Sequence, residues 1–167
     1  MLSESLQAAL NRQITAELQA SHGYLAMAAH FDHLDLPGFE SWMRGQADEE
    51  RAHAYRIFDF VLDRDGRVEL GGIDAPAGEF GAVLETMQTT LDHERRVSAQ
   101  INDLYELALG ENDFPAQVML QWFVTEQVEE EKVVTDIIDR LRLAGNDGAG
   151  LLLIDQEMSA RGVTPAE

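Results

Sequence analysis

The sequence predicts an all-α fold, a four-helix bundle with one long crossover and a short fifth helix at its C-terminal end. Three observations support this prediction. Apolar residues recur at intervals of three and four along most of the chain, which is the period of a helix that buries one face. Strand signals are weak, and Gly or Pro breaks the helical pattern at only a few points. One of these breaks is long enough to return the chain along a whole bundle.

The first two helices are expected to form a hairpin. The first is predicted over residues 5–33, with Ser3 or Ser5 as the residue that caps its first turn. The stretch LDLP then interrupts the pattern. The second helix is predicted over residues 37–64, because the fixed φ of Pro37 suits the first position of a helix.

The remaining elements follow from two Gly-rich turns and the crossover. GEND separates the third helix from the fourth, and AGNDGAG separates the fourth from the fifth. The expected ranges are 65–78 for the crossover, 79–109 for the third helix, 114–143 for the fourth and 151–161 for the fifth. An extended segment of about 15 residues spans up to about 50 Å, and a helix of about 28 residues is roughly 42 Å long. The second and third helices are therefore expected to be parallel.

The composition limits the classes of function. The chain has 167 residues, enough for a single domain, and no Cys, which excludes disulfides, thiolate metal sites and a Cys nucleophile. It has 12 Lys and Arg against 31 Asp and Glu, a formal net charge of −19. This balance argues against nucleic-acid binding and favours cations, although a solvated acidic surface or adaptation to salt would also produce it. The sequence shows no signal peptide and no apolar run of about 18 residues, so we expect a cytoplasmic protein that does not bind membranes.

Each of the four long helices carries a Glu on its apolar stripe. These residues are Glu17, Glu50, Glu94 and Glu130, and each lies near the midpoint of its helix. Because midpoints coincide in a bundle whichever way the helices run, the four carboxylates are expected to share one layer of the core. An unpaired buried charge costs several kcal/mol, at least about 3 when its partner is missing, so such a layer needs a cation. His53, one turn after Glu50, adds a nitrogen ligand on the same face.

A set of four Glu and one His provides only oxygen and nitrogen ligands. Such a set suits iron or manganese, and zinc is a plausible competitor. Glu50 is placed to bridge two metals, whose combined charge would balance four carboxylates. Tyr24 and Gln127 fall beside the layer. Taken singly, each residue has an ordinary interpretation, such as a core Tyr or a solvated Glu, and the prediction depends on their common depth in four helices.

Further acidic residues lie close to this layer. Glu126 and Glu129 are within one turn of Glu130, and Glu49 precedes Glu50. Together they could hold a third metal outside the paired site, or they could be plain surface acidity. The other histidines fall off the apolar stripes and are expected at the surface or at the edge of the core. They are His22, His30, His33 and His93.

Over essentially its full length the chain resembles the prokaryotic non-haem ferritins, which are members of the ferritin-like di-iron family. In the first helix the matching residues are Glu17, Leu18 and Tyr24. The other matching pieces are EERAH at 49–53, LDHE at 91–94, QWFVTEQVEEE at 121–131 and the short fifth helix. The haem-containing bacterioferritins have a His and a Met where this chain has Glu130 and Arg51. We therefore expect no haem.

The resemblance implies a role for each residue of the site. It implies one iron held by Glu17, Glu50 and His53, and a second held by Glu50, Glu94 and Glu130. It also implies a third site made by Glu49, Glu126, Glu129 and Glu130, with Tyr24 and Gln127 as supporting or oxygen-handling residues. The implied activity is ferroxidase: Fe(II) is oxidised by O2 or H2O2, and the ferric oxide is stored inside a shell of 24 chains.

Two other classes of function remain open. A di-iron oxidase or oxygenase acting on an organic substrate would need an apolar pocket beside the metals and need not form a shell. A metal-free helical interaction protein would not accelerate Fe(II) oxidation. The fifth helix, with its Leu and Ile cluster, could pack against neighbouring subunits or against its own bundle.

Overall fold

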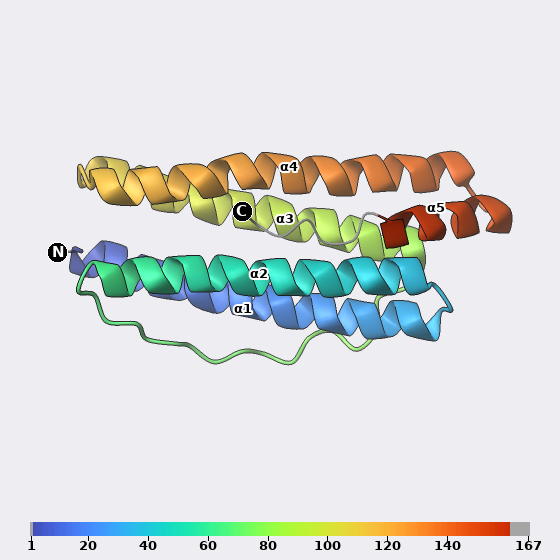
Figure 1. The fold of residues 1–167 in the computed structure, drawn as a ribbon, viewed down its shortest axis with the longest axis horizontal. Helices are drawn as coiled ribbons and strands as arrows, with labels where there is room; N and C mark the ends of the chain where they lie inside the picture. Colours follow the sequence, from blue (N-terminus) through green and yellow to red (C-terminus); the bar gives the residue numbers. More distant parts are fainter. Residues whose placement is uncertain (1, 161–167) are drawn as a thin grey trace.

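The all-α prediction is confirmed by the structure, a computed structural model that describes residues 2–160. Its helices are α1 (Glu4–His33), α2 (Pro37–Asp63), α3 (Val83–Gly110), α4 (Phe114–Ala144) and α5 (Gly148–Ala160). The first two form one antiparallel hairpin, and α3 and α4 form a second (Figure 1). The crossover returns along the length of the bundle, so that α2 and α3 run in the same direction (Figure 1). Within this range there is no strand.

Side-chain caps explain where the long helices begin. The Ser3 hydroxyl accepts a hydrogen bond from the Leu6 amide at 3.0 Å, and the Asp113 carboxylate accepts one from the Ala116 amide at 3.1 Å. Each cap satisfies an amide that the first turn of a helix leaves without a partner. Pro37 occupies the first turn of α2, where its missing amide costs nothing.

Two predicted helix starts are wrong. α3 begins at Val83 rather than at residue 79, because Gly81 has a φ of 76° and the Glu85 carboxylate accepts from the Ala82 amide at 3.0 Å. α5 begins at Gly148 rather than at residue 151. Here Asp147 provides the cap, accepting from the amide of Gly150 at 3.1 Å. The predicted end of this helix, at residue 161, lies outside the described residues.

The crossover is held to α1 by a ladder of polar side chains. Gln7, Asn11, Thr15 and Gln19 follow one another at intervals of four residues and therefore share one helical face. Gln7 binds the backbone of Arg67, and Asn11 binds the backbone of Arg67 and of Glu69. Further along, Thr15 binds the backbone of Gly71, and Gln19 binds the backbone of Asp74. This pairing gives partners to backbone groups of a segment that has no secondary structure of its own.

The fifth helix packs on its own bundle. Its buried Asp155 accepts a hydrogen bond from the Phe39 amide at 2.9 Å, in the first turn of α2. The contact requires glycine at residue 38, because a Cβ on Gly38 would lie 1.7 Å from the Asp155 carbonyl oxygen. Leu152 and Leu153 remain more than half exposed. One face of α5 therefore contacts the same chain, and an apolar pair remains at the surface.

Buried apolar side chains form two clusters, one toward each end of the bundle. The first contains Phe31, Phe39 and Met43, and the second contains Leu10 and Ile57. Between them lies a layer of buried polar residues, namely Glu17, Glu50, His53, Glu94 and Gln127. This arrangement places a polar layer halfway along the bundle, with an apolar cluster on each side.

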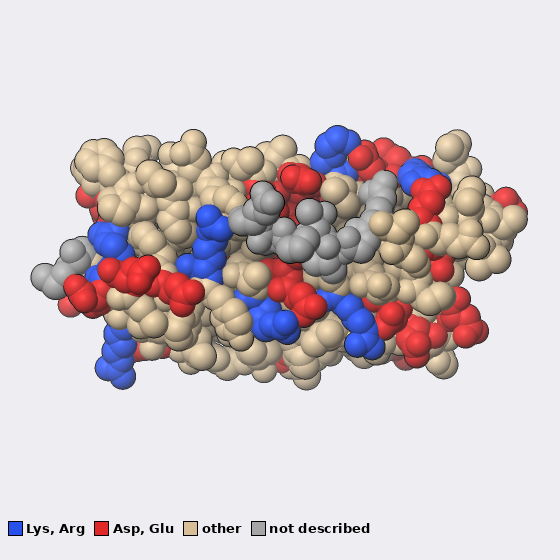
Figure 2. Space-filling model, in the orientation of Figure 1, with Lys and Arg blue, Asp and Glu red and all other residues tan. Residues whose placement is uncertain are grey.

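Acidic residues outnumber basic ones in the chain, 31 to 12. In Figure 2 they lie in several groups over the visible face, with Lys and Arg side chains between them. The mixture weakens local repulsion but leaves the net charge at −19. A search of the described helices finds none that is long and apolar enough to cross a membrane.

Candidate metal centre

Two groups of three potential metal ligands meet in the polar layer. The first is Glu17, Glu50 and His53, and the second is Glu50, His93 and Glu94. Within each group, one ligand atom from each residue lies within 4.8 Å of the others. Glu50 belongs to both groups, so the two form one continuous cluster. These are the groups of this kind found in residues 2–160.

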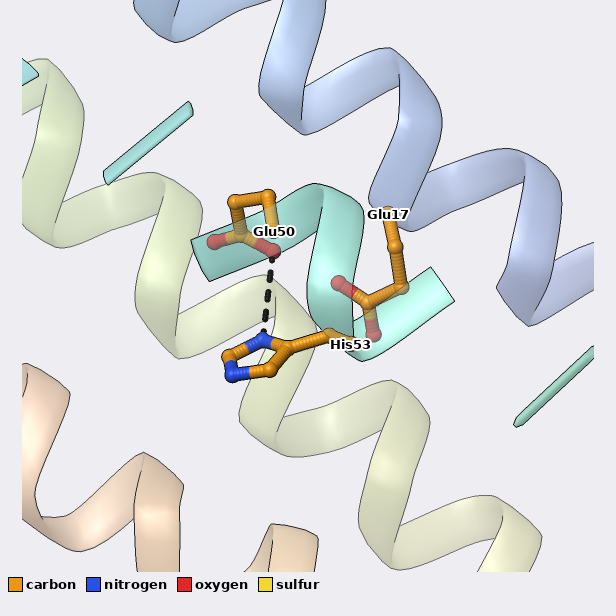
Figure 3. A group of neighbouring side chains, drawn as sticks. All are labelled: Glu17, Glu50 and His53. Carbon is orange, nitrogen blue, oxygen red and sulfur yellow. Dashed lines mark ion pairs between the residues drawn. The ribbon is translucent and has the colours of Figure 1, made fainter. Parts of the chain in front are cut away.

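The first group is contributed by α1 and α2. Glu50 and His53 are one turn apart on α2, and the side chain of Glu17 extends from α1 toward them (Figure 3). The His53 Nδ1 atom lies 3.6 Å from Glu50 Oε2, too far for a hydrogen bond (Figure 3). The Gln13 amide donates to Glu17 Oε1 at 2.8 Å and fixes that carboxylate from one side. The three side chains are almost completely buried, with exposed fractions of 0% for Glu17, 5% for Glu50 and 3% for His53.

Buried atoms without hydrogen-bond partners are concentrated in this cluster. They are Glu17 Oε2, Glu50 Oε2, His53 Nε2 and His93 Nε2, the complete set of such side-chain atoms in the part of the chain that is described. A buried polar atom without a partner costs about 1–3 kcal/mol, and most native proteins have few of them. A cation bound between these atoms would satisfy the oxygens and nitrogens together.

Glu94 is oriented by two residues that the sequence placed beside the site. The Tyr24 hydroxyl donates a short hydrogen bond to Glu94 Oε1. The Gln127 amide donates to Glu94 Oε2 at 3.2 Å and to the Glu94 carbonyl oxygen at 3.2 Å. Tyr24 and Gln127 therefore act on the site through Glu94. Burial, and then the charge of Glu94, raises the pKa of Tyr24 well above its usual value, so that its hydroxyl remains a donor.

Burial also raises the pKa values of the central carboxyls. The pKa of Glu17 is raised well above its usual value by burial and then by the charge of Glu50. The pKa of Glu50 is raised by burial and then by the charge of Glu94. For Glu94, burial raises the pKa, and the hydrogen bonds from Tyr24 and Gln127 partly oppose the shift. Without a cation the cluster holds protons, and a divalent ion would replace them.

Glu130 lies among the outer acids. Burial, and then the charges of Glu94, Glu49, Glu126 and Glu129, raises its pKa to about 9. Burial raises the pKa of Glu49 to about 7. Neither Glu130 nor Glu126 nor Glu129 belongs to a group of three close ligands in the described residues. The structure therefore brings together Glu17, Glu50, His53 and Glu94 and leaves Glu130 outside both groups.

His93 lies at the edge of the core, within the expectation for it, but it also joins a ligand group that the sequence did not predict. Although it lies off the apolar stripe of its helix, its ring packs edge-on against Tyr24, with centroids 5.8 Å apart. Burial, and then the charge of Arg96, lowers its pKa to about 4, so the ring is neutral near pH 7. Its position directly before Glu94 was the available signal. Of the other three, His22 and His33 are exposed, as expected, and the half-buried His30 is hydrogen-bonded to the Gly81 carbonyl oxygen.

The chain is similar to proteins of one family. The family described as Ferritin-like domain matches residues 7–144. The bacterial non-heme ferritin of Bacteroides fragilis (strain 638R) is 38% identical over 161 residues, covering 96% of this chain and 100% of the relative. The bacterial non-heme ferritin of Staphylococcus epidermidis (strain ATCC 35984) is 42% identical, covering 96% of this chain and 97% of the relative.

Solved structures give the same result. An open pore ferritin from the archaeon Archaeoglobus fulgidus superposes with a TM-score of 0.94 at 45% identity, covering 95% of this chain and 98% of the other. A humanized archaeal ferritin superposes with a TM-score of 0.97 at 45% identity, covering 99% of this chain and 100% of the other.

Proposed function

Because the chain belongs to the ferritin family, we propose that it is an iron-storage protein that oxidises Fe(II) at the candidate metal centre. The observation that supports this most is the set of four unpartnered buried atoms, each of which belongs to a residue of the two ligand groups. The donors are carboxylate oxygens and imidazole nitrogens, which suit iron. The cytoplasm remains the expected compartment.

In this proposal the polar layer would hold two Fe(II) ions as substrate, with Glu50 as a candidate ligand of both. Glu17 and His53 complete the first position, and Glu94 and Glu130 complete the second. Each Fe(II) ion gives one electron to the oxidant, O2 or H2O2. The chain positions the ions close together: Gln13 fixes Glu17 by donating to it, and Tyr24 with Gln127 holds Glu94. Such positioning of two ions lets one oxidant accept both electrons.

The storage part of the proposal concerns the assembly. We propose a hollow shell of 24 chains in which the ferric product accumulates. The exposed pair Leu152 and Leu153 on α5 gives an apolar surface for contacts with neighbouring chains. The net charge of −19 raises the local concentration of cations at the shell.

Aerobic iron loading tests this function. Purified protein is incubated with a large excess of Fe(II) and separated by size-exclusion chromatography with inline iron detection. We expect iron to co-elute with a particle of 24 chains of 18.6 kDa each, about 446 kDa. Iron limited to about two or three ions per chain on a small oligomer would instead indicate a di-iron oxidase. Failure to bind iron, with no oxidation above the buffer rate, would indicate a metal-free helical protein.

We also propose that Glu49, Glu126, Glu129 and Glu130 form an outer iron site. Its support is electrostatic, since the charges of the three other acids raise the pKa of Glu130. Glu129→Ala is expected to change the ratio of O2 consumed to iron oxidised, or the rate of iron turnover, more than the first rapid oxidation. Oxygen-electrode and stopped-flow measurements give these quantities. Glu106→Ala, which removes an exposed carboxylate from α3, is the control. A loss of the first oxidation as large as that from Glu50→Ala would refute an outer role.

A further inference from the structure

We propose that a pocket between α1 and α3 binds a small zwitterion of the amino-acid class, which carries a carboxylate, an ammonium group and an aliphatic side chain. The pocket has a volume of about 290 Å³. It is lined by side chains three or four positions apart within residues 9–16 of α1 and 100–107 of α3. None of them belongs to the two groups of potential metal ligands. The inference therefore goes beyond the proposed function and does not depend on it.

Small side chains leave this space between the two helices. Ala9 and Ala16 lie seven positions apart on one face of α1, and both line the pocket. The buried Leu104 and the half-buried Leu107 line it from α3. The volume is close to the lower limit for small-molecule sites, which is about 300 Å³. The pocket therefore suits a small molecule rather than a cofactor of nucleotide size.

The lining residues have a definite order along the pocket. Because α1 and α3 run in opposite directions, the middle of one lining set lies opposite the middle of the other (Figure 1). Arg12 of α1 and Asp103 of α3 therefore lie on opposite walls near the middle. Ala9, Leu104 and Leu107 lie toward one end, which is apolar. An aliphatic side chain of the ligand would be buried at this end.

The charged groups on the two walls have no partner of opposite charge in residues 2–160. Most other Lys and Arg side chains in this range form an ion pair with a carboxylate. Arg12 and Asp103 form none, although they line the same pocket. No acid lies three or four positions from Arg12, and no base lies three or four positions from Asp103. A ligand that carries both charges would give each of them a partner.

A buried amide provides one more acceptor for this ligand. Gln13 lines the pocket and is only 4% exposed. Its amide nitrogen donates to Glu17 Oε1 at 2.8 Å, and no group in the described residues donates to its own Oε1 atom. An ammonium group has three donors, so it can bind both Asp103 and this oxygen. The carboxylate of the same molecule would bind Arg12, whose planar guanidinium fits a carboxylate with two parallel hydrogen bonds.

Saturation-transfer NMR of small molecules mixed with the metal-free protein tests this proposal. Three probes have the same aliphatic body. L-leucine carries both charges, L-leucinamide carries only the ammonium group, and 4-methylpentanoate carries only the carboxylate. We expect L-leucine to bind with a dissociation constant on the order of 1 mM, as for other ligands of this size. Each of the other two should bind about 3–10-fold more weakly, because one charged group of the pocket then has no partner.

Two substitutions assign the charges to the walls. Arg12→Gln should make L-leucine and L-leucinamide bind equally, because the partner of the carboxylate is removed. Asp103→Asn should make L-leucine and 4-methylpentanoate bind equally, because the partner of the ammonium group is removed. Arg51→Gln and Asp59→Asn are the matched controls, since they alter exposed residues of α2 outside the pocket. Both should keep the order of binding of the unaltered protein.

The remaining outcomes would overturn the proposal. One is the absence of saturation transfer to L-leucine at about ten times the expected dissociation constant. Another is equal binding of all three probes that neither Arg12→Gln nor Asp103→Asn changes, which would indicate apolar contact alone. Tighter binding of L-leucinamide than of L-leucine would indicate a site for cations only. A protein that does not oxidise Fe(II) would contradict the proposed function, but the order of binding in this pocket would stay the same.

Discussion

Replacing Glu50 by alanine is expected to slow Fe(II) oxidation by at least about a hundredfold. Loss of a residue that only supports a metal ligand costs about 10–100-fold in affinity or activity, and Glu50 is a direct ligand candidate in both groups. The substitution also leaves His53 without its nearest carboxylate, 3.6 Å away. Both metal positions should therefore weaken together, and two ions should no longer be held close enough to reduce one oxidant.

Stopped-flow absorbance at two Fe(II) per chain in air-saturated buffer measures this effect. His53→Ala should cause a smaller loss than Glu50→Ala, because it removes a ligand from only one position. Asp59→Ala removes an exposed carboxylate from the same helix and should leave the rate unchanged. Size-exclusion chromatography should show the same particle for all three variants. An oxidation rate in Glu50→Ala equal to that of the unaltered protein would show that Glu50 is not a shared ligand. It would also contradict the paired centre.

The fold class could be predicted because its signals are local. The period of the apolar residues identifies the long helices, and Pro37 and Asp113 mark two of their starts. The starts of α3 and α5 could not be placed in this way. They depend on the Glu85 and Asp147 carboxylates, and either residue could equally have continued a helix. Similarly, nothing local shows that Asn11 binds the crossover 56 residues away.

The central cluster could be predicted because helical geometry fixes depth as well as face. Glu17, Glu50 and Glu94 lie near the midpoints of their helices, and the bundle places them in one layer. His93 lies at the edge of the core as predicted, but its approach to Glu50 and Glu94 was not predicted, because it lies off the apolar stripe of its helix. The side chain of His93 instead turns toward Tyr24 on the neighbouring helix, a contact that exists only once α1 and α3 pack.

Without metal ions, the folded protein is expected to lose stability as the pH rises from about 6.5 to about 9. Buried carboxyls with raised pKa values keep protons in the folded state that the unfolded chain releases near pH 4–5. Burial raises the pKa of Glu49 to about 7 and that of Glu130 to about 9, and it raises the pKa values of Glu17 and Glu50 as well. The folded state therefore holds more protons, and unfolding releases them.

The sign follows from this difference in bound protons. Each extra proton held by the folded state lowers the free energy of unfolding by about 1.4 kcal/mol per pH unit of increase. His93, whose pKa is lowered to about 4, has the opposite effect. It raises the free energy of unfolding as the pH increases from about 4 to 6.5. The fall should consequently be clearest above pH 6.5, where His93 is neutral in both states. Urea unfolding of chelator-treated protein at several pH values measures the slope.

Glu130→Gln provides a matched test, because it removes the group with the pKa of about 9 while keeping nearly the same shape. The variant should be more stable than the unaltered protein at pH 8 by about 1–3 kcal/mol in the absence of metal, and its slope should be shallower. Glu106→Gln, at an exposed position, should change neither quantity. Equal slopes for Glu130→Gln and the unaltered protein would mean that Glu130 does not hold its proton in the folded state.

Addition of saturating Co(II) should abolish the fall of stability with pH. A divalent ion binds the deprotonated carboxylates, so its affinity increases as protons leave, and at about 100 times its dissociation constant it adds about 2.7 kcal/mol to stability. The stability of the unaltered protein should then be nearly constant between about pH 6.5 and 8, because neither the metal-bound folded state nor the unfolded chain holds carboxyl protons there. The stability advantage of Glu130→Gln over the unaltered protein should be smaller with Co(II) than without it. A cluster of buried acids that exists only for packing would lose stability with pH whether or not Co(II) is present. The disappearance of the pH dependence on addition of Co(II) therefore distinguishes a metal centre from a strained acidic core.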